Sequence, residues 1–186
     1  MRVSDAVAEI LKREGVKVLI GYPVNHLIES AAATDIRTII VRQERTGIHM
    51  ADAMSRITSG RTVGVFCMQY GPGTENSFGG IAQAFADSVP VLILPAGSER
   101  HLQSVPPNFN AYLNMQHITK WIEQLVVPRQ TENVLRRAFT QVKNGRPRPV
   151  LVEIPWDVFE EDTPAPTSYR PAPRVRTAGD PSVIRG

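Results

Sequence analysis

The sequence predicts an α/β fold, a doubly wound and mostly parallel six-stranded sheet with helices on both faces. Six short apolar runs, several of them rich in β-branched residues, alternate with segments whose apolar residues follow helical spacing. The runs are continuously apolar, which is typical of parallel strands buried on both sides. Every connection between them is long enough for a crossover helix. We expect strands at 16–21, 38–41, 62–68, 89–95, 125–127 and 149–154.

The helices are predicted from the spacing of apolar residues between these runs. The first spans about 2–14, where Val3, Val7 and Ile10 fall on one helical face and Gly15 stands where a C-terminal cap belongs. Residues 98–117 carry several prolines and asparagines with weak periodicity, so they predict a long loop. The remaining helices are expected at 28–33, 48–57, 76–86 and 131–142.

The composition divides the chain into a domain at 1–161 and a Pro-rich linker at 162–186. Prolines are dense from residue 162 onward, which predicts a semi-extended segment that contributes little to stability. The last residues, from Asp180, look like the cap and first turn of a further helix. We therefore expect the linker to lead towards a central domain that is missing from this chain.

Composition and charge exclude several classes of protein. No stretch approaches the roughly 20 apolar residues of a membrane span, and the N-terminus lacks a signal-peptide pattern, so we expect a cytoplasmic protein without a membrane partner. The net charge of +3 leaves 17 basic and 16 acidic residues in 1–161, which argues against a nucleic-acid partner. A single cysteine, Cys67, and four scattered histidines predict neither a disulfide nor a metal site.

The loops after the strands are the places to search for chemistry, because doubly wound sheets bind ligands beyond the carboxyl ends of their strands. Glu44 follows the predicted strand 38–41, and an apolar helix begins a few residues later. A solvated carboxylate at a helix start is the ordinary interpretation of such a residue, since acidic side chains favour helix N-termini. A buried acid at a ligand site is the alternative.

A second motif, Gly71-Pro72-Gly73-Thr74-Glu75-Asn76, stands between the strand 62–68 and the helix 76–86. Glycines on either side of a proline form a tight turn in which backbone can approach a ligand closely, and the helix beyond offers free amide donors. A purely structural turn capped by Thr74 or Asn76 is the alternative. Nucleotide-binding glycine motifs and a hydrolase nucleophile elbow are absent from the sequence.

Taken in order, these motifs resemble the N-terminal pyrimidine-binding domain of thiamine diphosphate enzymes, in the branch of acetolactate synthases and 2-oxoacid decarboxylases. The resemblance covers about residues 1–162, and the Pro-rich tail matches the linker into the central domain of such enzymes. The matching segments are 21–23, 42–44, 50–53, 71–76, 84–90, 120–121, 146–150 and 154–158.

The resemblance implies a catalytic role for Glu44. The matching glutamate hydrogen-bonds a nitrogen of the cofactor's aminopyrimidine ring and assists the proton movement that activates the cofactor. By the same correspondence Pro23 lies near the cofactor, Gly73 allows close approach of the backbone, and Asn76 supplies a side-chain amide. Gln116 falls where family members place an active-site glutamine.

The sequence also departs from the family. Val24 stands where a glycine is common, and Gln43 replaces a frequent histidine, so the substrate and the reaction are open. The Gly-Asp-Gly motif that holds magnesium and the diphosphate is missing, so we expect the Mg²⁺-binding domain to lie elsewhere and this chain alone to be inactive.

Three interpretations remain. The first is the cofactor-activating domain of a thiamine diphosphate enzyme that decarboxylates or carboligates a small 2-oxoacid such as pyruvate. The second is a free-standing pyrimidine-domain subunit, as in two-chain sulfo- and phosphonopyruvate decarboxylases. The third is a non-catalytic α/β binding module. Under the first interpretation, the partners of this domain are the diphosphate-binding domain and a second copy of the chain.

The helices at 48–57 and 76–86 carry more apolar residues than one stripe against a sheet requires. We expect them to form the interface of a homodimer or a higher assembly.

Overall fold

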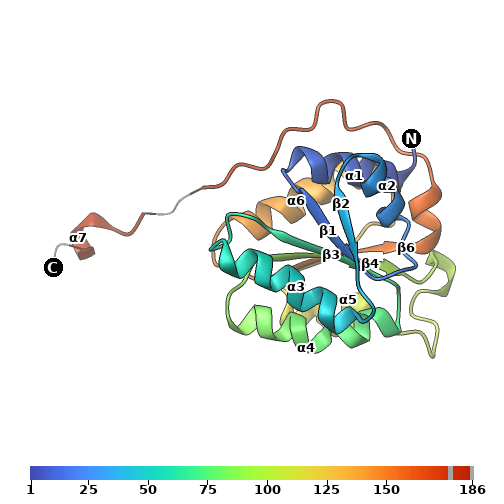
Figure 1. Ribbon diagram of the computed structural model, residues 1–186, viewed down its shortest axis with the longest axis horizontal. Helices are drawn as coiled ribbons and strands as arrows, with labels where there is room; N and C mark the ends of the chain where they lie inside the picture. Colours follow the sequence, from blue (N-terminus) through green and yellow to red (C-terminus); the bar gives the residue numbers. More distant parts are fainter. Residues whose placement is uncertain (176–177, 185–186) are drawn as a thin grey trace.

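The computed structural model describes residues 1–175 and 178–184, and it contains one six-stranded sheet in which all strand pairs are parallel (Figure 1). The strand order is β2-β1-β3-β4-β6-β5. The predicted doubly wound α/β fold is confirmed. The strands are β1 Val18–Gly21, β2 Arg37–Ile40, β3 Gly64–Met68, β4 Val91–Gly97, β5 Trp121–Gln124 and β6 Val150–Pro155.

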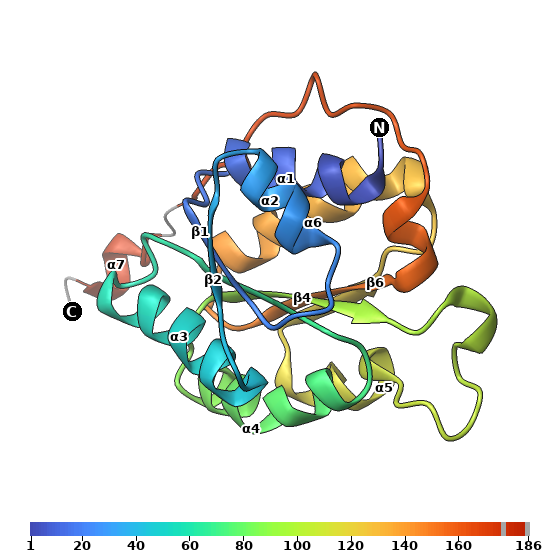
Figure 2. The same ribbon diagram turned by 45° about the vertical axis from the view of Figure 1, so that its right-hand side comes forward.

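Helices cover both faces of the sheet, as the two ribbon views show (Figures 1 and 2). One face carries α1 Val3–Arg13, α2 Leu27–Ala33 and α6 Thr131–Lys143. The other carries α3 Glu44–Ile57, α4 Pro72–Ala86 and the short α5 Ala111–Met115. The remaining elements are η1 Arg100–Leu102, η2 Gln116–Ile118, η3 Pro128–Gln130, η4 Trp156–Glu160 and α7 Pro181–Ile184.

Two hydrophobic cores follow from this layering, one on each side of the sheet. Residues alternate between them along β3, where Val65 and Cys67 pack under α1 and α6 while Phe66 and Met68 pack under α3 and α4. Gly80 lets α4 approach α3, because a methyl group there would collide with Ile48. None of the helices in the described residues is both long enough and apolar enough to cross a membrane.

The fifth strand was predicted at the wrong place. It spans Trp121–Gln124 instead of 125–127, and it pairs with β6 at the edge of the sheet. An edge strand is half exposed, so its residues mix polar and apolar types and do not form the apolar run that marks a central strand. Leu125 still continues the ladder through a backbone bond to Glu153.

Two helices begin earlier than the apolar spacing indicates. Helix α3 begins at Glu44 instead of residue 48, and α4 begins at Pro72 instead of residue 76. The first turns of both helices are polar or glycine-rich, so hydrophobic periodicity does not detect them. The motif at 71–76 is therefore the first turn of a helix and not a loop. Its N-cap is Gly71, at φ 54°, and neither Thr74 nor Asn76 caps it.

The segments at 98–117 and 163–175 also differ from expectation. Residues 98–117 contain η1, α5 and the start of η2, and the side chain of Asn110 caps α5. Residues 163–175 are extended as predicted, but they pack on α1 and α6, and Tyr169 and Ala172 are buried in the core. A segment without secondary structure can thus be firmly packed. The domain boundary itself, at 161 and 162, stays a prediction.

Candidate functional site

The candidate site lies at the carboxyl edge of the sheet, where the strand order reverses between β1 and β3. The chain leaving β1 runs to β2 on one side, while β3 lies on the other side. Asn25, buried in the loop after β1, ties this point together through its side-chain amide. Its Nδ2 donates to the carbonyl oxygens of Met68, at 2.8 Å, and Leu94, at 3.3 Å. These two bonds fix the β1 loop to the end of β3 and to the middle of β4.

Glu44 occupies the first position of α3, and only 4% of its surface is exposed. Each of its carboxyl oxygens accepts a hydrogen bond from a side-chain amide. Asn76 Nδ2, in the first turns of α4, donates to Oε2 at 3.1 Å. Gln69 Nε2, directly after β3, donates to Oε1 at 3.4 Å. The two motifs found in the sequence therefore meet at one buried carboxyl group.

Gly73 is required by this arrangement. A Cβ atom at this position would lie 2.6 Å from Cγ of Gln69 and 3.3 Å from Oε1 of Glu44. The first distance is shorter than real contacts, so any side chain would displace Gln69 or the helix. The close approach inferred for Gly73 is thus made to the side chains of the site itself. In the same turn, the Oγ1 atom of Thr74 is buried without a hydrogen-bond partner among the described residues.

Pro23 and Val24 lie in the loop after β1 and line a cavity of about 450 Å³. Val24 has a positive φ of 73° and is 57% exposed. Positive φ is a strained conformation for a β-branched residue, and glycine adopts it freely. The glycine that is common at this position would adopt the positive φ without strain, whereas Val24 adopts the same turn conformation with backbone strain. Val24 and Trp156 also line a second cavity of about 330 Å³.

Gln116 does not take part in the hydrogen bonds that join the other candidate residues. It is exposed at the junction of α5 and η2. In the described part of the chain, no hydrogen bond joins it to Glu44 or Asn76. The structure thus brings Glu44, Gly73 and Asn76 together and leaves Gln116 apart from them. The catalytic role of Glu44 and the cofactor-binding roles of all these residues and of Pro23 remain predictions.

Sequence reasoning missed Gln69, Asn25 and the short helix η4. The ring of Trp156, in η4, packs against the tilted ring of His26, with centroids 4.3 Å apart, and meets the Tyr70 ring edge-on at 6.4 Å. The carboxylate of Asp157 accepts two hydrogen bonds from Arg100, one from the side-chain Nε at 2.7 Å and one from the backbone amide at 3.1 Å. Helix η4 therefore joins the loops that follow β1, β3 and β4. The Trp156-Asp157 pair directly after a strand was the signal available in the sequence.

The charges around this edge follow from those contacts. Partial burial disfavours ionisation of Asp157, but its bonds with Arg100 prevail and hold the pKa of that carboxyl below its usual range. Among residues 1–175 and 178–184, no cluster of three or more His, Cys, Asp or Glu side chains is placed to hold a metal ion.

Comparison with known proteins decides the family. Residues 1–126 match the family described as "Thiamine pyrophosphate enzyme, N-terminal TPP binding domain". The chain belongs to this family. It is 32% identical over its whole length to a probable acetolactate synthase large subunit of Methanocaldococcus jannaschii, of which it covers 33%.

Two further enzymes are similar to this chain. Acetolactate synthase isozyme 3 large subunit of Escherichia coli is 32% identical over 84% of the chain, and 28% of that protein is covered. Glyoxylate carboligase of Escherichia coli O157:H7 is 30% identical over 96% of the chain, and 31% of that protein is covered. The chain therefore spans about a third of the length of the curated relatives that it matches.

The residues of the site fit the pyrimidine part of thiamine pyrophosphate. The ring carries nitrogen atoms that need hydrogen-bond partners, and Glu44 presents a buried carboxyl group whose position is fixed by Asn76 and Gln69. Gly73 and the unpartnered hydroxyl of Thr74 lie in the adjoining turn of α4.

Proposed function

We propose that this chain is the N-terminal, cofactor-activating domain of a thiamine diphosphate-dependent enzyme that acts on a small 2-oxoacid by carboligation or decarboxylation. The observation that carries the proposal is Glu44, a buried carboxyl group at the start of α3 with both oxygens held by amide donors. The similarity to acetolactate synthases and to a glyoxylate carboligase supports the reaction class.

Thiamine diphosphate, when bound, supplies a carbanion and an electron sink for cleavage or formation of a bond beside a carbonyl group. In this proposal Glu44 hydrogen-bonds a pyrimidine nitrogen and holds or releases one proton there. Asn76 and Gln69 fix the direction of the carboxyl group, so no reorganisation is needed when the proton moves. Gly73, in the first turn of α4, leaves room for the side chain of Gln69 and so for the carboxyl group that Gln69 holds.

In this proposal a second part of the site lies outside these residues. The diphosphate and Mg²⁺ need oxygen ligands, and we assign these to another domain of the whole protein. On this view the chain alone binds thiamine diphosphate weakly and has no activity. We further propose that the enzyme is cytoplasmic, and that its pyrimidine domain works within a homodimer or a larger assembly.

The test is an assay of the complete gene product that contains this chain. With thiamine diphosphate, Mg²⁺ and pyruvate or glyoxylate, we expect release of CO₂ and formation of a coupled product, identified by mass spectrometry. Calorimetry of residues 1–186 alone should find thiamine diphosphate bound at least about a thousandfold more weakly than by the whole protein, a difference of about 4 kcal/mol. Micromolar binding to the isolated chain would contradict the divided site.

A further inference from the structure

The segment of residues 163–175, here called the C-terminal strap, crosses the outside of α1 and α6 (Figures 1 and 2). It begins beside the N-terminus, where the backbone amide of Thr163 donates to the carbonyl of Met1 at 2.9 Å. It has no helix or strand, and proline occupies four of its positions. It is nevertheless hydrogen-bonded to the domain at Thr163 and again between residues 167 and 175.

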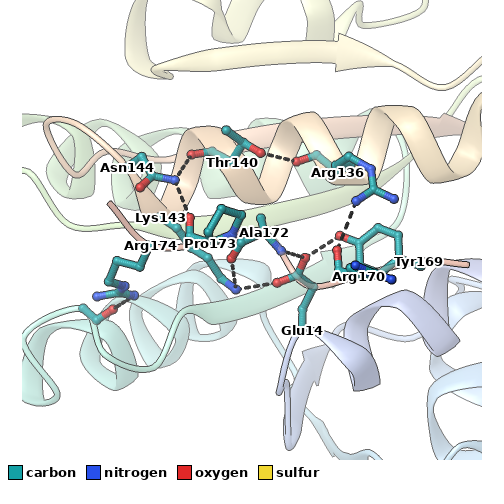
Figure 3. Close-up of polar contacts among 11 residues, drawn as sticks. Glu14, Arg136, Thr140, Lys143, Asn144, Tyr169, Arg170, Ala172, Pro173 and Arg174 are labelled. Carbon is teal, nitrogen blue, oxygen red and sulfur yellow. Dashed lines mark hydrogen bonds and ion pairs between the residues drawn. The ribbon is translucent and has the colours of Figure 1, made fainter. Parts of the chain in front are cut away.

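Glu14, directly after α1, is the centre of these contacts (Figure 3). Its side chain is fully buried, with 0% exposed. The carboxylate forms an ion pair with Lys143 of α6 and accepts hydrogen bonds from the Tyr169 hydroxyl and, at 2.9 Å, from the backbone amide of Ala172. Two of its three donors therefore come from the strap.

Without these bonds, the position of the Glu14 carboxylate would be unfavourable for two reasons. Carboxylates are destabilising at helix C-termini because the helix dipole places negative charge there. Burial of a charge is costly as well, unless it is paired and hydrogen-bonded. The strap supplies that compensation, and burial together with the nearby Glu14 raises the pKa of Tyr169 above its usual value, so its hydroxyl stays protonated as a donor.

Further contacts hold the strap on both sides of this centre. The Arg136 guanidinium lies over the Tyr169 ring, 4.6 Å from its centroid, and donates to the Arg170 carbonyl at 3.1 Å. Asn144 Nδ2 donates to the carbonyl of Pro173 at 2.9 Å. At the end of the strap, Arg174 donates to the carbonyl of Gly60 at 2.6 Å.

These contacts determine where the chain leaves the domain. The strap starts after η4, at the carboxyl edge of the sheet, and ends beside Gly60 and Asn144, which precede β3 and β6 and so lie at the amino edge. Glu44 lies at the carboxyl edge, at the start of α3. The strap thus carries the chain from the edge that holds the candidate site to the opposite edge.

We infer that Glu14 is a positioning residue that locks the C-terminal strap onto α1 and α6, and that this lock sets the exit point of the chain at the sheet edge opposite Glu44. The strap is then a fixed part of the domain and not a flexible linker. Its role is to give the segment after residue 175 one starting position relative to the candidate site. The inference does not depend on the proposed catalytic role of Glu44.

Pulsed electron paramagnetic resonance on the chain 1–186 tests the lock. Cys67 is buried, and burial raises the pKa of its thiol, so introduced surface cysteines take up spin labels selectively. Asn133 on α6 and Ser168 on the strap are exposed, and their side chains make no hydrogen bond among the described residues, so Asn133→Cys and Ser168→Cys provide the two labelling sites. We expect one narrow distance distribution in the parent chain and at least a twofold broader one after Glu14→Ala.

Glu9→Ala is the matched control, because it removes the same charge from α1 at a residue that makes no ion pair among those described. It should keep the narrow distribution. An equally narrow distribution in Glu14→Ala, with the chain folded, would overturn the lock.

A second measurement covers the case in which Glu14→Ala does not fold. Glu14→Gln keeps the shape of the side chain but removes the charge that faces Lys143. Amide hydrogen exchange of this variant should be at least about tenfold faster than in the parent at Ala172, whose amide donates to Glu14, and unchanged in β4. Equal protection of Ala172 in the two chains would show that Glu14 does not hold the strap.

Discussion

Asn76 and Glu44, 32 residues apart in the sequence, are joined by a hydrogen bond of 3.1 Å between Nδ2 and Oε2. This bond connects the first turns of α4 and α3, which follow different strands. Gln69 completes the arrangement from the end of β3. A carboxyl group that donors hold on both oxygens has a defined direction, which is what proton transfer to a bound ring requires.

The first prediction concerns Glu44 in the complete gene product. Glu44→Gln removes the proton-transferring group at almost constant volume, so turnover should fall at least about a hundredfold, the usual contribution of a general acid or base. Steady-state kinetics and thermal unfolding measure activity and fold separately. Glu75→Gln, an exposed neighbour in α4, is the control and should leave both unchanged. Turnover of Glu44→Gln within about threefold of the parent would refute the assignment.

The second prediction uses two glycines of the same helix. Gly73→Ala places a methyl group 2.6 Å from Cγ of Gln69, and this overpacking should destabilise the chain by about 1–3 kcal/mol. Gly79→Ala meets nothing within 4 Å and should stabilise it by up to about 1 kcal/mol, since alanine favours helix. Urea unfolding of both variants gives the two free energies. Equal effects would mean that the contact between Gly73 and Gln69 is not tight.

How much of this site was predictable depends on the residue. Glu44 and Asn76 stand out because they follow apolar strands and belong to a recognised motif. Gln69 lies one residue beyond β3 without a motif of its own, and only the three-dimensional fold places it beside Glu44. The central strands were found because burial on both faces makes them continuously apolar, whereas β5, half exposed at the sheet edge, has no such pattern.

The C-terminal strap shows a different limit of the sequence. Proline density predicts an extended backbone, and the backbone is extended, but composition says nothing about whether such a segment packs. The contacts of Tyr169 and Ala172 are with Glu14, about 155 residues earlier. Long-range pairing of this kind leaves no local pattern.

The third prediction concerns the strained residue Val24. Val24→Gly relieves a positive φ of 73°, which costs about 1–3 kcal/mol for a non-glycine residue. Glycine loses about 0.5–1 kcal/mol through its greater backbone freedom in the unfolded chain, so the net change should be a stabilisation of roughly 1 kcal/mol. Differential scanning calorimetry should show a rise in Tm of about 2–4 °C.

Val105→Gly, also exposed and in a loop but outside the positive-φ residues, is the control for Val24. It has no strain to relieve and should lower Tm. A fall in Tm for both variants would show that the Val24 turn is unstrained.

The fourth prediction concerns the pH dependence of stability. Burial raises the pKa of Glu153 above its ordinary value of 4.5, although Gln124 and the Tyr112 amide oppose this by donating to the carboxyl group. The pKa of Glu153 is higher in the folded chain than in the unfolded chain, so the protonated carboxyl group favours the folded state. Its contribution to the free energy of unfolding is fully present below pH 4.5 and is lost as pH rises through the raised folded pKa. Glu153→Gln cannot titrate and should lack this loss.

The measurement for Glu153 is the Tm of the parent and the variant from pH 4 to 8. The Tm of Glu153→Gln minus that of the parent should increase as pH rises and then level off. Glu75→Gln, at an exposed position, should track the parent at every pH. A constant difference between Glu153→Gln and the parent would mean that Glu153 does not titrate in this range.

The last prediction concerns assembly through α3 and α4. Of the apolar residues on these helices, Ile81 is buried in the core, but Ile57 is 80% exposed and Phe78 is 43% exposed. Closed twofold pairing is the commonest way in which a protein covers exposed aromatic and aliphatic groups such as these. We expect the chain 1–186 to sediment as a dimer at high concentration, and Phe78→Glu to shift it to a monomer. Val127→Glu introduces the same charge at an exposed valine outside these helices and should remain dimeric. A parent chain that stays monomeric at high concentration would remove this interface from the proposal, and monomers of both variants would show that added charge alone disperses the assembly.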